Sequence, residues 1–339
     1  MSYLHTYFNH TQAVEDAARP LGVKATVDLS DGSLQLVDGQ RTESWRAKYL
    51  ATLDGRTVYL PARGPGVIGF AGWMPYPLRQ WRTAVDKIAF KRCAIAAGVD
   101  TPAACFDPEQ IGGPFLIKHA GGSFGEGIRG PFLAHEPGNP QHRLADGEYY
   151  ENFVVGHIAK AWCWGDHCVA LHLDAPSIVT GDGQSTLRAL VQALPNSRQG
   201  EHDWALVGRL AEYCGITSLD AVLPKGKEVL VEFRYESRYQ VTARDGNPNR
   251  MPSLRDHDLG RQFSHAAKVF SGSISPEPAL RQSFFTLDAM IDPEGRASFL
   301  EMNCNPLVHP DLYAPMLTTY FAGAQRTAVA APQAAMVAA

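Results

Sequence analysis

The stretch FFTLDAMIDPEGRASFLEMNCNP, residues 284–306, decides the fold, because it predicts two short strands joined by a tight turn. The turn falls on DPEG, residues 292–295, where proline comes early and glycine late. Strand pairing reflects about the centre of such a turn, so Asp288 is expected to lie opposite Glu301. The sequence therefore predicts a hairpin that brings these two carboxylates together.

One face of this hairpin is expected to be polar and the other apolar. Successive side chains of a strand point to opposite faces, which puts Glu301 and Asn303 on the same face. The residues expected to point into a core are Leu300, Met302 and Cys304. Together with Asp288, the polar face offers two carboxylates and an amide oxygen, a donor set that suits Mg²⁺. An ordinary solvated hairpin face is the alternative interpretation.

Length, composition and charge bound the remaining possibilities. The 339 residues predict two domains or one large α/β domain, and 45% hydrophobic with 19% charged residues is ordinary for a globular protein. The formal net charge of −4 does not indicate binding to nucleic acid or to an anionic membrane. No apolar run is long enough to span a bilayer, and the first twenty residues lack a signal-peptide pattern. The expected location is the cytoplasm.

The six cysteines do not indicate a disulfide framework in a chain of this length. They are Cys93, Cys105, Cys163, Cys168, Cys214 and Cys304. His167 between Cys163 and Cys168 suggests a metal site, but two small buried residues in a pair of strands are the favoured interpretation.

Residues 1–80 predict small β-hairpins. Strand-like segments at 25–29, 34–37 and 57–60 are separated by DGS, DGQ and DGR turns. The Gly/Pro-rich stretch PARGPGVIGFAGWMPYP, residues 61–77, is either a connector, which we favour, or a loop beside a ligand. No GxGxxG motif opens a helix here, so a dinucleotide fingerprint is not indicated.

A glycine-rich loop follows a predicted strand in the next region. A helix is expected to begin at Thr83. It includes the helical pattern DKIAFKRCAIAAG, residues 86–98, which ends at a glycine and precedes the strand-like GGPFLIKHA, residues 112–120. The loop GGSFGEGI, residues 121–128, allows close backbone approach to a ligand, and its N–H groups can surround phosphate oxygens. Lys118 on the strand would add a positive charge. Because no GK[ST] ends the loop, it is not a Walker A motif, and a flexible hairpin tip is the alternative.

The rest of the chain alternates between strand and helix patterns. Expected strands are 149–155, 159–164, 168–173 and 226–235, and expected helices are 187–194, 201–215 and 259–272. Glu151, on the first of these strands, offers an acceptor for an adenine amino group, and a solvated strand glutamate is the alternative. Helices mixed with antiparallel hairpins predict the α+β class.

Three segments, taken in order, carry a resemblance to a known family. They are DKIAFKRCAIAAGVDTP (86–102), PFLIKHAGGSFGEGI (114–128), and LD (287–288) with FLEMNCNP (299–306). Together they resemble the ATP-grasp superfamily of carboxylate–amine ligases. The first is similar to its DK helix and the following turn, the second to its lysine strand and glycine-rich lid, and the third to its D…ExN metal cluster.

The middle region is most similar to the ATP-grasp module of cyanophycin synthetase and of the bifunctional glutathione synthetases. The similarity lies in GDGQSTLRALV (181–191), in CGITSLDAVLPKGKEVLVEF (214–233) and in the ExNxNP motif that ends at Pro306. Where those relatives continue with an Asn-x-Ser-Thr-Gly-Gly segment, this chain has RYESRYQVTARDGNP (234–248). The resemblance therefore implies the fold and the ATP chemistry, but not the substrates.

The fold that the resemblance implies is ATP-grasp, in which two α+β subdomains clasp ATP, preceded by a small N-terminal α/β domain. The expected divisions are an N-terminal domain at 1–82, an ATP-grasp domain at 83–322 with its lid at about 104–150, and an alanine-rich flexible tail at 323–339.

The resemblance also implies roles for single residues toward ATP. Lys87 and Lys118 would contact the phosphates. The lid residues that would close over the phosphates are Gly121, Gly122, Ser123, Gly125 and Gly127. Glu151, with the backbone at Phe153 and Val154, would bind adenine. A further acidic residue that binds ribose in some relatives is replaced by Ile158, and the residues considered in its place are His157 and Lys160.

Asp288, Glu301 and Asn303 would hold two Mg²⁺ ions, with Mn²⁺ as a possible substitute. D-alanine–D-alanine ligase-like enzymes place an arginine two residues before the first metal carboxylate, where this chain has Thr286. The transferred phosphate would then need another cation, and the candidates are Arg234 and Arg281.

The implied activity is ATP-dependent formation of an amide or peptide bond through an acyl phosphate, with release of ADP and phosphate. The expected partners are small amino-acid-like carboxylate and amine substrates, with no nucleic acid or membrane and with a possible homodimer. An ATP-binding regulatory module without ligase activity is the alternative, and a small-molecule phosphotransferase on the same fold is a further one.

Overall fold

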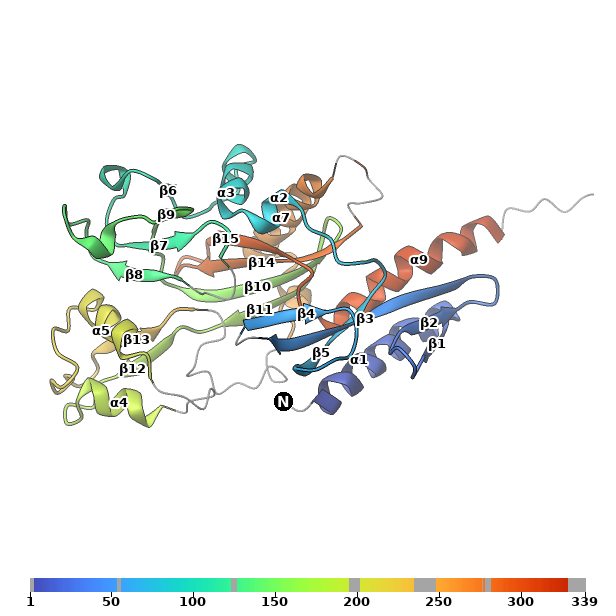
Figure 1. The fold of residues 1–339 in the computed structure, drawn as a ribbon, viewed down its shortest axis with the longest axis horizontal. Coiled ribbons are helices and arrows are strands. Elements are labelled where there is room, and N and C mark those ends of the chain that lie inside the picture. The colour runs from blue at the N-terminus through green and yellow to red at the C-terminus, as the bar shows by residue number, and fades with distance from the viewer. Residues whose placement is uncertain are drawn as a thin grey trace, which may run out of the picture. The chain divides into compact units, whose positions relative to one another are not determined.

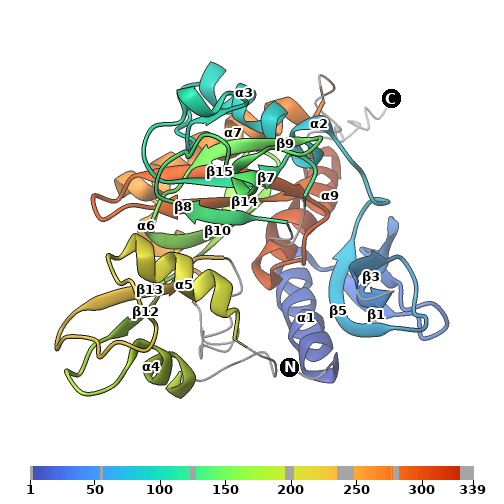
Figure 2. The same ribbon diagram turned by 60° about the vertical axis from the view of Figure 1, so that its left-hand side comes forward.

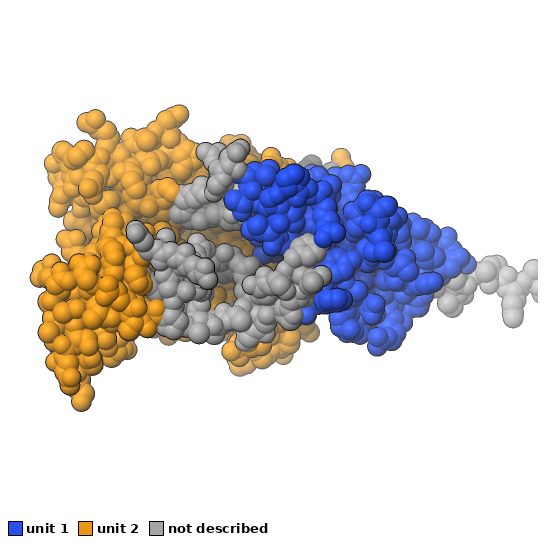
Figure 3. All heavy atoms as spheres, turned by 60° about the horizontal axis from the view of Figure 1, so that its bottom comes forward, with its two compact units in different colours: residues 1–79, 305–339 blue, residues 80–304 orange. Residues whose placement is uncertain are grey.

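The computed structural model describes residues 3–53, 56–122, 127–194, 202–234, 248–275, 277 and 282–328. The chain forms two compact units, unit 1 with Met1–Arg79 and Asn305–Ala339, and unit 2 with Gln80–Cys304 (Figure 3). This division differs from the predicted boundaries at residues 82 and 322, because the C-terminal residues from 305 onward group with the N-terminal ones. The predicted functional domains themselves stay a prediction.

Unit 1 combines an antiparallel sheet with helices from both ends of the chain (Figure 1). Its elements are α1 (Tyr3–Ala18), η1 (Arg19–Leu21), β1 (Lys24–Val27), β2 (Leu34–Val37), β3 (Thr42–Leu53), β4 (Arg56–Leu60), β5 (Val67–Met74), η5 (Pro310–Leu312) and α9 (Tyr313–Ala328). The strand order is β1-β2-β3-β4, and β5 also pairs with β3. The first six residues of the predicted tail continue helix α9, and residues 329–339 lie outside the described residues.

Strand β5 overturns the prediction that residues 61–77 form a connector. Its residues pair with β3, and Gly72 adopts a φ of +108° there. A Cβ on Gly72 would come within 2.5 Å of the Val308 side chain. The backbone N–H of Val308 donates to Ala71 O at 2.9 Å, which holds the two chain segments together. Glycine is therefore needed for the close approach of the C-terminal chain, which the sequence pattern did not indicate.

The hydroxyl of Tyr313 fastens helix α9 within unit 1. It lies 2.8 Å from Nδ1 of His10 on α1 and accepts the backbone N–H of Trp73 on β5 at 3.1 Å. Burial, together with the nearby His309 and Lys48, lowers the pKa of His10 to about 3. The ring of His10 is therefore neutral at physiological pH, so this buried contact adds no charge to the core.

Unit 2 contains three antiparallel sheets with interspersed helices (Figure 2). Its helices are α2 (Arg82–Val85), α3 (Lys87–Ala96), η2 (Pro108–Gln110), η3 (Pro140–His142), α4 (Leu187–Ala193), α5 (Trp204–Tyr213), α6 (Met251–Leu254) and α7 (Asp258–Ile274). Its strands are β6 (Ala104–Cys105), β7 (Phe115–His119), β8 (Arg129–Phe132), β9 (Glu148–Asn152), β10 (His157–Trp164), β11 (His167–Asp174), β12 (Ser177–Thr180), β13 (Glu228–Glu232), β14 (Phe284–Ile291) and β15 (Ala297–Cys304). The sheet orders are β11-β10-β14-β15, β6-β9-β7-β8 and β12-β13, which confirms the α+β class. None of the described helices is long and apolar enough to cross a membrane.

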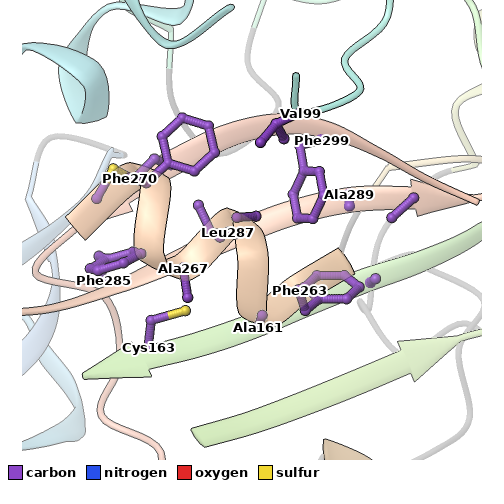
Figure 4. Close-up of a cluster of buried hydrophobic side chains, with 14 of the residues drawn as sticks. Val99, Ala161, Cys163, Phe263, Ala267, Phe270, Phe285, Leu287, Ala289 and Phe299 are labelled. Atoms are coloured by element: carbon purple, nitrogen blue, oxygen red, sulfur yellow. The ribbon is translucent and has the colours of Figure 1, made fainter. Parts of the chain in front are cut away.

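Helix α7 covers one face of the sheet β11-β10-β14-β15 (Figure 4). Phe263, Ala267 and Phe270 of α7 lie buried against this sheet, where they join Leu287 of β14 in one apolar cluster. Phe90 of α3 stacks on Phe270 with ring centroids 4.3 Å apart and planes at 9°. Because the strands alternate their side chains, the opposite face of the same sheet is left for polar residues.

The hairpin β14–β15 has the predicted register, with Asp288 directly opposite Glu301. The pairing then shifts by one residue, so Leu300 is the extra residue of a bulge. Phe299 and Met302 enter the core, whereas Leu300 is only half-buried, and the prediction that it points into the core is wrong. Because of the bulge, the side chains before Leu300 lie on the opposite faces of the sheet from those that strict alternation along the strand would predict.

All six cysteines are free thiols. Cys163 and Cys168 pair across β10 and β11, and Cys163 lies in the apolar cluster. Among the described residues, no three His, Cys, Asp or Glu side chains are grouped to hold a metal ion. The pairing of the buried Cys163 with the half-buried Cys168 agrees with the favoured interpretation that both lie in a pair of strands.

Truncating Phe270 tests the cluster between α7 and the sheet. Phe270→Ala is expected to lower the free energy of unfolding by about 3–5 kcal/mol, because it removes a fully buried ring and leaves a cavity. Urea unfolding of both proteins measures this difference. Ile95→Ala on α3 removes an exposed apolar side chain and serves as the control, with an expected change within about 0.5 kcal/mol. An equal small loss in both variants would contradict the assigned core.

Candidate active site

The polar face of the β14–β15 hairpin brings the three predicted metal ligands together. Asp288 and Glu301 are opposite each other, and Asn303 lies two residues beyond Glu301 on the same face. Nδ2 of Asn303 donates to Oδ2 of Asp288 at 3.1 Å and lies 3.4 Å from Oε1 of Glu301. Two carboxylates and one amide thus form a compact group on two adjacent strands.

Two lysines neutralise these carboxylates in the structure. Lys160 of β10 is directly opposite Asp288, and its Nζ lies 2.8 and 3.2 Å from the two carboxylate oxygens. Lys87 reaches from helix α3, with Nζ 2.8 Å from Oε2 of Glu301. Each carboxylate therefore has its own ammonium group.

Local sequence determines where Lys87 lies. The carboxylate of Asp86 accepts the N–H groups of Ile88 and Ala89 and so caps helix α3, which makes Lys87 its first residue. The backbone N–H of Lys87 donates to Ala120 O at 3.0 Å, at the end of the β7 strand segment. The helix start is thus fixed next to the glycine-rich loop.

Burial is the largest influence on both hairpin carboxylates, and it acts to raise the pKa of each. For Asp288 this effect prevails over Lys160, and the neighbouring Glu301 adds to it, so the pKa is raised. For Glu301 the charges of Lys87, Lys160 and Lys118 outweigh burial, so the pKa is lowered. An additional cation at Asp288 would favour its ionised form.

A second buried ion cluster is centred on Glu151 of β9. Its Oε2 lies 2.7 Å from Nζ of Lys91, and its Oε1 contacts Nζ of Lys118 on β7. The hydroxyl of Tyr149 donates to Oε2 at 3.3 Å. Because Lys118 pairs with Tyr149 across the strands, all of these groups except Lys91 come from one face of the sheet β6-β9-β7-β8.

Burial also acts to raise the pKa of Glu151, but Lys118 and Lys91 outweigh it, and the pKa is lowered. Burial lowers the pKa of Lys91. The carboxylate of Glu151 acts to raise this pKa but does not outweigh burial, and the nearby charge of Lys118 lowers it further. The pKa of Tyr149 is raised by burial, and both Glu151 and Glu301 add to the effect. The two ion clusters therefore act on each other and form one electrostatic site.

The described part of the glycine-rich loop lies beside Lys87. Nζ of Lys87 donates to Gly122 O, and the N–H groups of Gly121 and Gly122 donate to Nδ1 and O of His119 at 3.0 and 3.1 Å. Gly127 adopts a φ of +71°. The predicted lid residues outside the described residues are Ser123 and Gly125.

Two of the predicted adenine-binding residues, Glu151 and Phe153, are buried in this structure. Both carboxylate oxygens of Glu151 are held by lysines, so adenine would need one of these contacts to open. Phe153 packs against Tyr213 and Phe233, and its N–H donates to the carbonyl of residue 114. Val154 is half-buried. Adenine binding by Glu151, Phe153 and Val154 stays a prediction.

Of the two arginine candidates for phosphate binding, Arg234 lies within the described residues. Arg234 forms ion pairs with Glu232 at 2.8 Å and with Asp203 at 3.3 Å, next to the sheet β12-β13. The charge of Arg234 is thus compensated by two carboxylates. Among the described residues, no contact links Arg234 to Asp288. Arg281 lies outside the described residues. Lys160 is instead the cation beside Asp288.

Sequence reasoning missed three members of the site. Lys91 follows Lys87 by four residues, so helical spacing would place both on one face of α3. Tyr149 precedes Glu151 by two residues on β9, which puts both on one face of the strand. Lys160 was considered only for ribose, because its position opposite Asp288 depends on a pairing between strands more than a hundred residues apart.

The chemistry of the donor set fits Mg²⁺. This ion takes one or two carboxylates and completes its shell with water and substrate phosphates, and it accepts amide oxygens. Asp288 is a buried carboxylate and Glu301 a half-buried one at facing positions, and Asn303 supplies the amide.

Comparisons with known proteins were made for the sequence and for the structure. No protein-family model and no curated protein matches the sequence. Among solved structures, the chain is similar to a bifunctional glutathione synthetase from Pasteurella multocida, with a TM-score of 0.39 and 15% identity over 91% of this chain and 44% of that one. It is also similar to VanG D-Ala:D-Ser ligase from Enterococcus faecalis, with a TM-score of 0.38 and 15% identity over 70% of this chain and 62% of that one.

A third similar structure is ATP-grasp ligase PsnB complexed with a phosphomimetic variant of its minimal precursor, Mg and ADP. The TM-score is 0.36 and the identity 15%, over 70% of this chain and 58% of that one. Ligases, including an ATP-grasp ligase, are therefore among the solved structures to which this chain is similar. The chain spans less than two thirds of each of the three, and likeness at this level carries no activity over to it.

Removing the charge of Glu151 tests the second ion cluster. Glu151→Gln leaves the ammonium groups of Lys91 and Lys118 buried without a counter-ion, which is expected to cost about 3–5 kcal/mol of stability at pH 7. The folded-state pKa of Glu151 is below its unfolded value, so its contribution is present above about pH 4.3 and is lost as pH falls through the folded pKa. The difference between wild type and variant should therefore shrink in urea unfolding below about pH 4.

Asp220→Asn is the matched control for this experiment. It breaks the exposed pair with Arg188, where Nε and Oδ1 are 2.7 Å apart, and is expected to cost at most about 1 kcal/mol. Equal losses from both substitutions at pH 7 would show that burial does not distinguish the two ion pairs.

Proposed function

We propose that this protein is an ATP-dependent carboxylate–amine ligase of the ATP-grasp kind. The observation that carries the proposal is the group of Asp288, Glu301 and Asn303 on one hairpin face, with Lys87 and Lys160 bound to its carboxylates. An ordinary solvated hairpin face would not place a buried carboxylate directly opposite a second carboxylate.

The ion pairs of the site suit an exchange of partners. In this structure Lys87, Lys118 and Lys160 are each paired with a carboxylate. A nucleotide with its Mg²⁺ would bring phosphates for the lysines and a cation for the carboxylates. Every buried charge would then keep a partner of opposite sign, so binding would not leave an unpaired charge in the site.

Asp288, Glu301 and Asn303 would hold Mg²⁺, and two ions fit the resemblance to the ATP-grasp family. When bound, the metal would neutralise charge on the phosphates during transfer. Lys87 and Lys118 would orient the phosphates together with N–H groups of the glycine-rich loop. Lys160, rather than Arg234, would meet the transferred phosphoryl group, because it is the described cation beside Asp288.

The proposed reaction proceeds in two parts. An oxygen of the substrate carboxylate attacks the γ-phosphorus of ATP, the bond to the β–γ bridging oxygen breaks, and ADP leaves with that electron pair. The amine nitrogen then attacks the acyl carbon, the carbon–oxygen bond breaks, and phosphate leaves while the amine loses a proton. The protein's part is positioning and charge stabilisation, since no side chain need form a covalent bond.

Two alternatives are distinguished by products. A regulatory module would bind ATP tightly but would not release ADP faster when amino acids are added. A phosphotransferase would yield a phosphorylated small molecule without an amide. The facing carboxylates of Asp288 and Glu301 favour the ligase and the phosphotransferase over the module, since both activities need the metal to stabilise transfer. The cytoplasmic location, the homodimer and amino-acid-like substrates stay predictions.

Neutralising Glu301 tests the proposal. Glu301→Gln keeps the side-chain shape but removes one of the two carboxylates, so Mg²⁺-dependent binding of ADP is expected to weaken by about 10–100-fold. Amino-acid-stimulated ADP release should fall below detection, measured with a panel of amino acids. Glu294→Ala, in the exposed turn of the same hairpin, is the control and should behave as wild type. ADP release by Glu301→Gln at the wild-type rate would refute the metal site.

A further inference from the structure

Thr286 has a buried hydroxyl without a partner. The residue is completely buried, and within the described chain its Oγ1 forms no hydrogen bond. Buried hydroxyls in proteins are nearly always hydrogen-bonded, because an unpaired one loses its contact with water and gains nothing in return. The Thr286 hydroxyl is therefore a hydrogen-bond donor and acceptor that no described group uses.

The position of Thr286 relates it to the proposed metal ligands. It lies two residues before Asp288 on β14 and directly opposite Asn303 on β15, so all three side chains share the polar face. Directly opposite residues of an antiparallel pair have Cβ atoms about 4.5–5.5 Å apart. A rotation of the Asn303 side chain alone can thus bring its amide to the hydroxyl.

The present orientation of the Asn303 amide is suited to a site without a cation. Its Nδ2 group faces the carboxylates of Asp288 and Glu301 and donates toward both. A cation bound to these carboxylates would repel that NH₂ group and attract the amide oxygen instead. The amide has to turn, and its NH₂ group then needs a new acceptor.

We propose that Thr286 is the positioning residue for Asn303 when the site holds its cation, an inference that rests on the proposed function. With Oδ1 of Asn303 turned to the cation, Oγ1 of Thr286 accepts a hydrogen bond from Nδ2. Trp162, which faces Thr286 from β10, offers only an N–H donor and cannot take this role. The hydroxyl thus fixes the amide in its ligating orientation, and its lack of a partner in the present state is explained.

Thr286→Val tests this inference, because valine keeps the shape and removes the hydroxyl. Two quantities are measured: the midpoint of thermal unfolding without metal, and the Mg²⁺ concentration that gives half-maximal ADP binding by calorimetry. The unfolding midpoint should stay the same or rise, since an unpaired buried hydroxyl is replaced by a methyl group. The half-maximal Mg²⁺ concentration should increase by about 10-fold, as for other groups that orient a metal ligand.

Thr286→Ser retains the hydroxyl and is the matched control, with an expected Mg²⁺ dependence within about twofold of wild type. The effect should also require Asn303. In an Asn303→Ala background, Thr286→Val is expected to change the Mg²⁺ dependence no further, because the orienting group has nothing left to orient. If Thr286→Val does not fold, Thr286→Ala takes its place in the same measurements.

The outcomes separate this inference from the proposed function. A wild-type Mg²⁺ dependence in Thr286→Val, or a full effect that persists in the Asn303→Ala background, would overturn the role of Thr286 alone. A lower unfolding midpoint of metal-free Thr286→Val than of Thr286→Ser would also overturn it, because the hydroxyl would then be used without metal. Wild-type binding of ADP that is independent of Mg²⁺ would overturn both the inference and the metal site.

Discussion

The rest of unit 2 depends on one constraint, the placement of the buried Asp288 directly opposite the half-buried Glu301 on one hairpin. Two adjacent carboxylates with little access to water are unfavourable unless cations compensate them, and here Lys160 and Lys87 do so. These lysines come from a neighbouring strand and from the first turn of a helix. The position of α3 and the pairing of β10 with β14 are therefore tied to the charges of the hairpin.

The sheet β11-β10-β14-β15 separates packing from chemistry by its two faces. One face packs against α7 and α3 through an apolar cluster that includes Phe263, Phe270 and Phe90. The other face carries Lys160, Asp288 and Asn303. The packed apolar face holds the strands in place, and this fixes the distances between the charged side chains on the other face. The site is therefore preorganised because side chains alternate between the two faces of each strand.

The sequence predicted most of what depends on local periodicity. The register of the hairpin and the strand with Lys118 could be read from turn residues and alternation. The helix predicted from Thr83 is instead two helices, because Asp86 is extended and caps α3. The bulge at Leu300 and the strand β5 could not be read in this way, because each depends on a distant partner. The same is true of the site, where the carboxylates were found locally but Lys160 comes from a strand paired across a long sequence separation.

The arrangement of charges has a consequence for how ligands bind. Mg²⁺ alone would displace Lys160 and Lys87 from their carboxylates, so that both ammonium groups would lose their counter-ions. A nucleotide alone would draw the lysines to its phosphates and leave Asp288 and Glu301 uncompensated. Binding of either ligand alone would therefore cost free energy that binding of the other would recover. This difference is the coupling free energy between the two ligands. By linkage, each ligand would raise the affinity of the protein for the other by the same factor.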